Sequence, residues 1–456
     1  MPSRDLLQTE PPPDILTSSG GVWRLAWPII LANSTTPLLG LVDTAVIGNI
    51  GRSIDLGAIA LGTLIFSFLY WSFGFLRMGT TGFTARAYGS GDTAEVRAIL
   101  GRALLISCVI GLGLILLQWP IATFALKLLG ASSQIESLTR DYLLIRVWAA
   151  PASLALYVCM GLLIGLGQSG KLLRVQLLVN GLNILLDILL AGLLGWGITG
   201  IAAGTAIAEW LALLYAGWVS YRLLTTIRED KEAFWPWQRI FDLPRLRHTL
   251  SANTDILLRT LALLFGFAWF TDQSARFGDL VLAGNHILLQ LISFSAFFLD
   301  GFAFAAETLV GRAAGMGRRD LFLQAVHSTS RLAVITAFCF FLMLITMGPL
   351  VINGLTDLSE VRASAGRYLP YAAIYVLLSV AAFQLDGIFI GATATRAMRD
   401  ASLVSVMLFI AAWWLLAGWL GNVGLWLAFI LFVFVRALTL GLHYPSLRDG
   451  LVQIPH

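Results

Sequence analysis

The chain has 456 residues, of which 58% are hydrophobic and only 12% are charged. Soluble domains carry about 25% charged residues, so this composition excludes an ordinary water-soluble protein and indicates helices that face lipid. The formal net charge of +4 is small. We interpret the basic residues as orientation signals of a membrane protein and not as a nucleic-acid surface.

Apolar runs of about 20 residues, the length that crosses a hydrocarbon core of roughly 30 Å, recur along the whole chain. We predict an all-α integral membrane protein with twelve transmembrane helices. In chain order the predicted spans lie near residues 23–48, 56–78, 97–122, 138–165, 172–194, 197–224, 247–271, 279–304, 322–352, 363–392, 399–420 and 422–443. With both termini inside, 21 Lys and Arg fall on the cytoplasmic face and 6 on the other. We therefore expect cytoplasmic termini.

The predicted spans fall into two similar sets of six. The motifs A-R-A-Y-G-S-G and G-R-A-A-G-M-G lie 226 positions apart, as do Tyr142 and Tyr368. Gly197 and Gly421 are 224 positions apart. An even number of spans separates the copies, so the copies share one orientation in the membrane. Parallel repeats of this kind occur in transporters, around a central cavity.

This repeat divides the chain into two lobes joined by a charged connector. The predicted segments are a disordered cytoplasmic tail (1–21), an N-lobe with the first six helices (22–224), a cytoplasmic linker (225–246), a C-lobe with the last six helices (247–445) and a second cytoplasmic tail (446–456). The first tail is polar and proline-rich, and it lacks the pattern of a removable signal peptide.

Ionisable side chains inside predicted spans are the main functional candidates, because each costs roughly 2.5 to 3.5 kcal/mol at membrane depth. Asp43 lies in the first span, and we interpret it as a functional carboxylate. A buried hydrogen-bonding role is the alternative. Pro28 precedes it in the same span and removes a backbone hydrogen bond, which predicts a bend point.

Three polar residues of the fifth predicted span fall on one helical face. Asn180, Asn183 and Asp187 are spaced by three and four residues. Thr205 and Glu209, four apart, lie in the sixth span. A carboxylate beside amides and a hydroxyl can hold a proton or coordinate a hard cation through oxygen atoms. The alternative for Thr205 is a hydrogen bond to its own backbone.

The second half carries acids of its own. Asp300 and Glu307 are seven residues apart on one face of the eighth span, and Asp386 lies in the tenth. A helical face with two acids can bind a cation or simply line a wet cavity. Both interpretations stay open for these three residues.

Basic residues within or near spans need partners or access to water. Asp255 and Arg259, four apart, are predicted to form an ion pair on the helix surface. Arg436 is predicted to extend its guanidinium to the cytoplasmic surface. No partner can be named for Arg146 from the sequence.

Motifs of nucleotide, metal or hydrolase chemistry are not supported. G-L-G-Q-S-G-K-L, from Gly165, differs from a phosphate-binding loop because Leu172 replaces the hydroxyl residue, and the motif follows a membrane helix. The five histidines are scattered without ligand spacing. We therefore predict no enzyme activity, no metal site and no cofactor other than a coupling ion.

Five motifs carry a resemblance to a known family. They are P-L-L-G-L-V-D-T-A-V-I-G around Asp43, L-R-M-G-T-T-G-F-T-A from Leu76, L-N-I-L-L-D ending at Asp187, L-D-G-F-A-F-A-A-E ending at Glu307 and D-G-I-F-I-G-A-T from Asp386. These motifs resemble the MATE (multidrug and toxic compound extrusion) exporters, and more narrowly their DinF-like branch. The resemblance covers essentially the whole chain after the tail.

The resemblance implies two six-helix lobes around a central cleft, and export of organic cations, drugs or toxic metabolites in exchange for protons or sodium. In such proteins the residues matching Asp43, Asn183, Asp187 and Thr205 belong to an N-lobe cation site. The proline matching Pro28 is where the first helix is proposed to bend.

Proton coupling is favoured over sodium coupling. Asp386 falls where sodium-coupled relatives carry a C-lobe acid, but the glutamate expected in their seventh span is absent. We expect a monomeric antiporter of amphipathic cations in the plasma membrane (the bacterial inner membrane), with membrane lipid and no nucleic acid among its partners. The alternatives are a flippase for lipids or lipid-linked precursors, disfavoured because in-membrane acids outnumber bases, and a channel, which would conduct without coupling.

Overall fold

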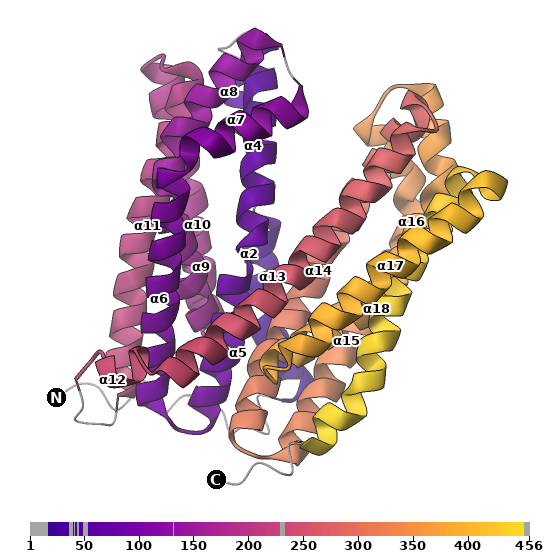
Figure 1. Cartoon of the computed structure of the whole chain (residues 1–456). Helices are drawn as coiled ribbons and strands as arrows, with labels where there is room; N and C mark the ends of the chain where they lie inside the picture. Colours follow the sequence, from indigo (N-terminus) through magenta and orange to yellow (C-terminus); the bar gives the residue numbers. More distant parts are fainter. Residues whose placement is uncertain are drawn as a thin grey trace. The chain divides into compact units, whose positions relative to one another are not determined.

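The computed structural model describes residues 17–35, 40, 42, 45–48, 53–130, 132–228 and 233–450. These residues form helices and turns, and no strand occurs among them (Figure 1). Two compact units result: the first includes Leu31–Tyr88 and Asp92–Thr249, and the second includes Gly89–Gly91, the chain from Leu250 and the segment that ends at Ile30. The lobe boundaries drawn from the sequence stay a prediction.

Several helices in the first half of the chain are interrupted, although α11 (Gly197–Ile227) is continuous over 31 residues. After α2 (Ser19–Ser34) the helices of this half are α4 (Ser53–Ser72), α5 (Phe75–Gly89), α6 (Thr93–Leu116), α7 (Gln118–Leu129), α8 (Ser133–Arg146), the 3₁₀ turn η1 (Val147–Ala149), α9 (Ala150–Gly165), α10 (Ser169–Leu186), the π-helix η2 (Asp187–Leu193), α11 (Gly197–Ile227) and the short connector helix α12 (Trp237–Ile240). The end predicted near residue 122 for the third span is wrong, because α6 ends at Leu116 and a separate helix, α7, follows.

Helices in the second half are long and continuous. They are α13 (Leu243–Ala275), α14 (Asp279–Gly315), α15 (Arg319–Leu355), α16 (Ser359–Gly391), α17 (Thr395–Leu420) and α18 (Asn422–Gly450). A helix of 37 residues, the length of α14 and α15, measures roughly 55 Å at 1.5 Å per residue. These helices therefore exceed the thickness of the hydrocarbon core.

Eleven helical segments among the described residues are long and apolar enough to cross a membrane. The remaining predicted span, near residues 23–48, holds α2 together with residues outside the described part of the chain. The all-α membrane architecture is thereby confirmed, and a total of twelve spans is consistent with it.

Helix boundaries confirm the internal repeat residue by residue. The starts of α14, α15 and α16, at Asp279, Arg319 and Ser359, each lie 226 positions after the starts of α4, α6 and α8 at Ser53, Thr93 and Ser133. Their ends, at Gly315, Leu355 and Gly391, lie 226 positions after Gly89, Leu129 and Gly165, the ends of α5, α7 and α9. Each long helix of the second half therefore corresponds to an interrupted pair in the first.

One close helix contact recurs in both units. A Cβ atom added at Gly161 of α9 would lie 2.5 Å from the backbone oxygen of Arg77 in α5. At the corresponding positions, a Cβ atom at Gly387 of α16 would lie 2.4 Å from the backbone oxygen of Ala303 in α14. Glycine is needed at both positions because the backbones approach too closely for any side chain.

Candidate ion-coupling site

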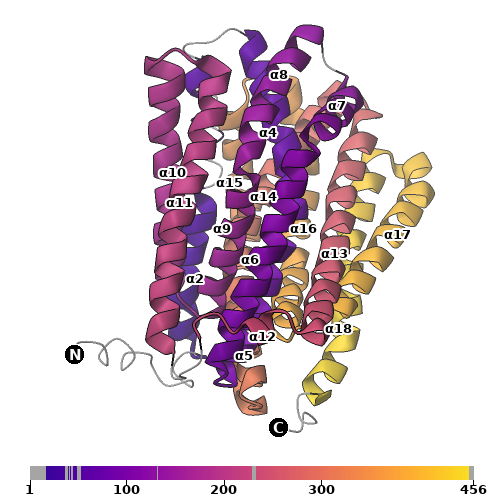
Figure 2. The same ribbon diagram turned by 60° about the vertical axis from the view of Figure 1, so that its left-hand side comes forward.

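The polar face predicted on the fifth span lies in the first unit, where α10 and α11 run side by side (Figure 2). Asn183 of α10 is buried, and its Nδ2 donates a hydrogen bond of 2.8 Å to Oγ1 of Thr205 in α11. The Thr205 hydroxyl in turn donates to the backbone oxygen of Ile201 at 3.0 Å. Thr205 therefore makes both of its predicted contacts, one with its own backbone and one with the polar face.

Asn180, one turn earlier on α10, extends this polar row. Its Nδ2 donates to Oγ1 of Thr35 at 2.6 Å, and its Oδ1 accepts from Nε2 of Gln176 at 3.1 Å. Thr35 directly follows α2 and donates to the backbone oxygen of Ala32 at 2.7 Å. Asn180 thus ties α10 to the end of α2, a link that the sequence did not reveal.

Asp187 stands where α10 changes from an α-helix into the π-helical η2. Its side chain is 0% exposed. A Cβ atom at Gly204 of α11 would lie 2.6 Å from Oδ1 of Asp187. The carboxylate therefore lies directly against the glycine that precedes Thr205, and π-helical turns of this kind occur frequently at functional sites.

A second polar group lies one turn further along α11. Glu209 accepts a hydrogen bond from the Ser153 hydroxyl of α9. Arg146, at the end of α8, donates to the Tyr142 hydroxyl, and its guanidinium lies 5.0 Å from the centre of the Phe66 ring. These contacts supply the partners that the sequence could not name for Arg146.

Acids of the second unit pair with arginines on other helices. Asp386 of α16 accepts from Nη2 of Arg259 in α13, and Nη2 of Arg436 in α18 lies 3.5 Å from the same carboxylate oxygen. Asp255 accepts from Thr395 at 3.0 Å and from Arg399 at 2.7 Å.

These contacts correct two predictions. The ion pair predicted between Asp255 and Arg259 is wrong, because each residue faces a different helix of the bundle and finds a closer partner there. Arg436 does not extend to the cytoplasmic surface, since its side chain is only 5% exposed and pairs with Asp386. A cation that bound Asp386 would have to displace two guanidinium groups.

The other acids of the second half lie on α14. Glu307 is buried and Asp300 is half-buried. Asp300 interacts electrostatically with Arg436. The structure thus joins Asp300 and Asp386 to one arginine, whereas Glu307 lies two helical turns further on, where its backbone oxygen meets Gly391.

The same two positions that pair Asn183 with Thr205 hold aromatic rings in the second unit. Phe409 lies 226 positions after Asn183, and Phe429 lies 224 positions after Thr205. Their ring centroids are 5.8 Å apart, and both side chains are fully buried. The fold can therefore fill this place with apolar side chains, so the polar pair of the first unit is not a requirement of the architecture.

Comparison with known proteins identifies the family. A model of the MatE family matches residues 28–189 and 256–415, which is more than half of the chain. The chain belongs to the MATE family. It is 38% identical to DNA damage-inducible protein F of Escherichia coli (strain K12), over 93% of this chain and 92% of that protein. It is 26% identical to "Probable multidrug resistance protein NorM" of Agrobacterium fabrum, over 93% and 92% of the two chains.

Solved structures give the same fold. The crystal structures of MATE in the straight and in the bent conformation match with TM-scores of 0.87 and 0.85, at 17% and 18% identity. The matches cover 98% and 97% of this chain, and 100% and 99% of those chains. This MATE protein is accordingly a multi-pass membrane transporter of small molecules and not an enzyme.

Asp43 lies outside the described residues. Pro28 is buried within α2, which continues for six more residues to Ser34. Its role as a bend point stays a prediction, as does the coupling role of the polar face on α10.

Sequence reasoning missed several members of this MATE protein's polar groups. Ser153, Thr35 and Gln176 carry no signal by themselves, because hydroxyl and amide residues are common in spans and often bond their own helix. Among the described residues, no group of three or more His, Cys, Asp or Glu side chains is placed to hold a metal ion.

Proposed function

We propose that this MATE transporter exports amphipathic organic cations, drugs or toxic metabolites in exchange for protons. The observation that carries the proposal is the polar face of Asn180, Asn183 and Asp187 in the first unit, where the second unit has Val406, Phe409 and Trp413. Polar groups at membrane depth are costly, and an apolar filling is available to this fold. Retaining them in one half only is typical of a functional site.

Proton binding at Asp187 is the central step of the proposed cycle. With the site open to the outside, a proton neutralises the carboxylate, while Asn183 and Thr205 keep their mutual hydrogen bond. Loss of the charge weakens the attraction for a cationic substrate, and the substrate leaves. After reorientation the proton dissociates inside, and the ionised site binds a new substrate. Asp43, by resemblance, is the second acid of this cycle, and Pro28 is the bend in the first helix.

The driving force is sufficient without ATP. One elementary charge that crosses 100 mV releases about 2.3 kcal/mol, which corresponds to roughly a fiftyfold concentration ratio. A single proton per cycle, with its own concentration gradient added, can therefore sustain uphill export.

Proton coupling is preferred to sodium coupling because of the second unit. There Asp386 is already held by Arg259 and Arg436, two cations that belong to the chain itself. A sodium ion needs several oxygen ligands in addition to a carboxylate that is not already paired.

Location and assembly complete the proposal. We place the transporter in the plasma membrane with both termini in the cytoplasm, since 20 basic residues fall on that side once the buried Arg436 is left out, and 6 fall on the other. It acts as a monomer, because one chain contains both halves of the repeat. Reporter fusions at each terminus, active only in the cytoplasm, test the orientation.

Efflux from vesicles tests the coupling. Purified protein is reconstituted, and efflux of a fluorescent cationic dye is followed under an imposed pH gradient or an imposed sodium gradient. We expect wild-type efflux to follow the pH gradient and Asp187→Asn to abolish it. Asp272→Asn, which removes an exposed carboxylate of α13 (63% exposed), serves as the matched control. Efflux that followed sodium, or that persisted in Asp187→Asn, would contradict the proposal.

A further inference from the structure

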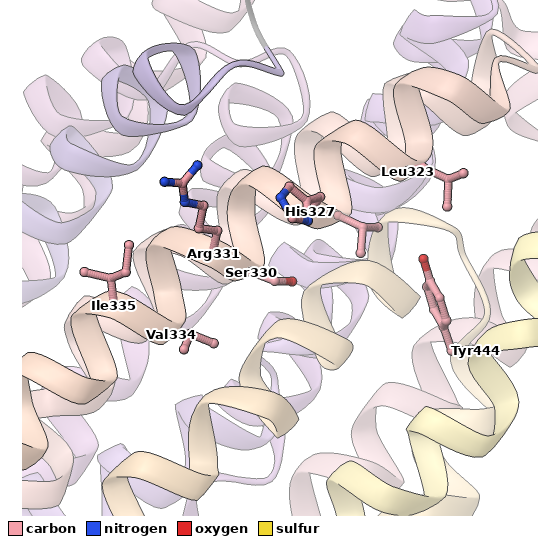
Figure 3. A pocket seen from close by; sticks show the side chains of 8 residues that line it. Leu323, His327, Ser330, Arg331, Val334, Ile335 and Tyr444 are labelled. Carbon is pink, nitrogen blue, oxygen red and sulfur yellow. The ribbon is translucent and has the colours of Figure 1, made fainter.

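A groove of about 750 Å³ opens on the surface of the second unit. It is lined by one face of α15, from Leu323 to Ile335, and by Tyr444 of α18. Figure 3 shows Leu323, His327 and Arg331 in order along one helix, with the Tyr444 ring on another. This volume lies in the range of sites that hold small organic molecules.

The groove has a polar part and an apolar part. His327, Ser330 and Arg331 line the polar part, and Val334 and Ile335, each 50% exposed, line the apolar part. Within the described part of the chain, no carboxylate forms an ion pair with Arg331 and no hydrogen bond engages His327. An exposed arginine without a counter-ion, one turn from a histidine, is a ready site for an anion.

The corresponding place in the first unit is covered. Gly101 of α6 lies 226 positions before His327, and a Cβ atom there would be 2.7 Å from Cδ1 of Ile240 and 3.5 Å from the Trp235 ring. Both covering residues belong to the connector around α12. Arg97 also fixes the connector, by donating to the backbone oxygen of Phe234 at 2.9 Å.

The repeat therefore places the connector of the first unit over the surface that corresponds to the groove. Among the described residues of the second unit, only Tyr444 of α18 joins α15 in lining the groove. The chain just before α2 reaches the same helix, because the Thr17 hydroxyl donates to Oε1 of Gln324 at 2.8 Å, but Thr17 does not line the groove. Within the described part of the chain, Arg331, Val334 and Ile335 of the groove are exposed, whereas Gly101 of the first unit lies under the connector.

The groove lies near the end of α15 where basic residues gather, and we expect this end to meet the lipid headgroups. Its lining residues follow the start of α15 by 4 to 16 positions, which is roughly 6 to 24 Å along the helix at 1.5 Å per residue. Arg318, Arg319 and Arg448 mark the same end of the unit. Basic pockets between helices at this level bind anionic lipid headgroups.

We propose that this groove binds one anionic phospholipid. Its phosphate lies between the side chains of His327 and Arg331, and its acyl chains lie along Val334 and Ile335. The site depends on the membrane location of the chain and not on its coupling ion. A result that contradicted proton antiport would therefore leave the lipid-site proposal unaffected, and the reverse also holds.

Lipid retention by the purified full-length protein tests this site. Protein in detergent is mixed with phosphatidylglycerol or phosphatidylcholine, and bound lipid is counted by native mass spectrometry. We expect selective retention of phosphatidylglycerol, lowered about fivefold in Arg331→Gln, since a basic residue near an anionic surface contributes about 1 kcal/mol. Val334→Trp, which fills the apolar part without a change of charge, should lower the retention of both lipids in the groove.

Arg396→Gln is the matched control. Arg396 is exposed on α17 of the same unit and does not line the groove, so its loss should leave retention unchanged. All three positions are exposed, and such substitutions change stability little. Melting temperatures within about 2 °C of wild type confirm the fold of each variant. Equal retention in Arg331→Gln and Arg396→Gln, no preference for phosphatidylglycerol, or equal affinity for inorganic phosphate alone would each overturn the proposal.

Discussion

The two halves of this transporter share their helix boundaries but differ in continuity. α14, α15 and α16 run unbroken, whereas their counterparts in the first unit are divided at residues 73–74, at Leu117 and at 147–149. α17 is likewise continuous where α10 passes into the π-helical η2 at Asp187. At these four places the second half therefore keeps a continuous helix, and the first half has a break or a π-helical turn.

Two of the four interruptions lie beside buried polar side chains. The π-helical turn begins at Asp187, and η1 separates Arg146 from Ser153, the partner of Glu209. A break in the regular hydrogen-bond ladder re-aims the side chains that follow it. The first half therefore places amides and hydroxyls beside a buried acid, whereas in the second half Asp255 and Asp386 pair with arginines of the same unit.

The largest effect on transport is expected when the first unit receives the ring pair of the second. In Asn183→Phe with Thr205→Phe, the amide and hydroxyl beside Asp187 are lost, so we expect efflux driven by a pH gradient to be abolished. Vesicle dye efflux measures the effect. Leu177→Phe, at an exposed position of α10 (50% exposed), is the control. Efflux retained in the double variant would show that the polar pair is only a packing element.

Removing the carboxylate of Asp386 tests how much its buried ion pairs stabilise the second unit. Asp386→Asn leaves Arg259 and Arg436 without their shared carboxylate, and breaking a buried pair in this way costs about 3 to 5 kcal/mol. Thermal unfolding in detergent should show a large drop in melting temperature. Asp357→Asn, an exposed partner of Arg362, should change it little.

Replacing all three charged residues by apolar ones is the complementary experiment to Asp386→Asn. We expect the combination of Arg259→Met, Asp386→Met and Arg436→Met to recover much of the lost stability, because the three charges that pair with one another are then removed together. An unchanged melting temperature in Asp386→Asn would contradict a structural role for the pair. It would return Asp386 to the candidates for ion coupling.

A smaller loss of stability is expected from a substitution where α11 contacts Asp187. Gly204→Ala places a methyl group 2.6 Å from the carboxylate oxygen, and crowding of this kind costs about 1 to 3 kcal/mol. Gly181→Ala in α10, where a Cβ atom meets nothing within 4 Å, should instead be neutral or slightly stabilising. Equal melting temperatures for both variants would show that the carboxylate can move away from α11.

The smallest predicted change in stability concerns the turn that contains Thr393 in the second half and Gly167 in the first. Thr393 has a φ of 58°, and its counterpart Gly167, 226 positions earlier, has a φ of 64°. A left-handed backbone costs a residue with a Cβ atom about 1 to 2 kcal/mol, so Thr393→Gly should raise the free energy of unfolding by about 1 kcal/mol. Gly167→Thr should lower it by a similar amount, and any other ranking would contradict the matched geometry.

Much of the fold could be predicted from the sequence because lipid makes hydrophobic length a direct signal. The spans, the repeat and the shared face of Asn183 and Asp187 all follow from spacing. The interruptions were not predicted, although Gln118 and Pro120 follow Leu117 and Pro151 lies at the start of α9. Proline lacks the backbone N–H that continues a helix, so these residues are a signal for two of the breaks. No proline lies near Asp187. Helix breaks depend on backbone contacts with neighbours, such as Gly204 against Asp187.

Ion-pair partners that lie on different helices could not be predicted from the sequence either. Arg259 has an acid four residues earlier, and local spacing favours that pair, yet the tertiary fold brings Asp386 closer. Local rules rank only the partners that the same helix offers. Pairing of buried charges is decided by which faces meet in the bundle.

The constant offset of 226 positions, from Ser53 and Asp279 to Gly165 and Gly391, has a consequence for how such a chain can change. Adding or removing one residue within a helix rotates everything beyond it by about 100°. In a membrane, that rotation would expose a polar helix face to lipid and would pack an apolar face against polar side chains. Neither copy shows such a shift relative to the other between these glycines. Substitution, not insertion or deletion, has been the route by which the two copies diverged there.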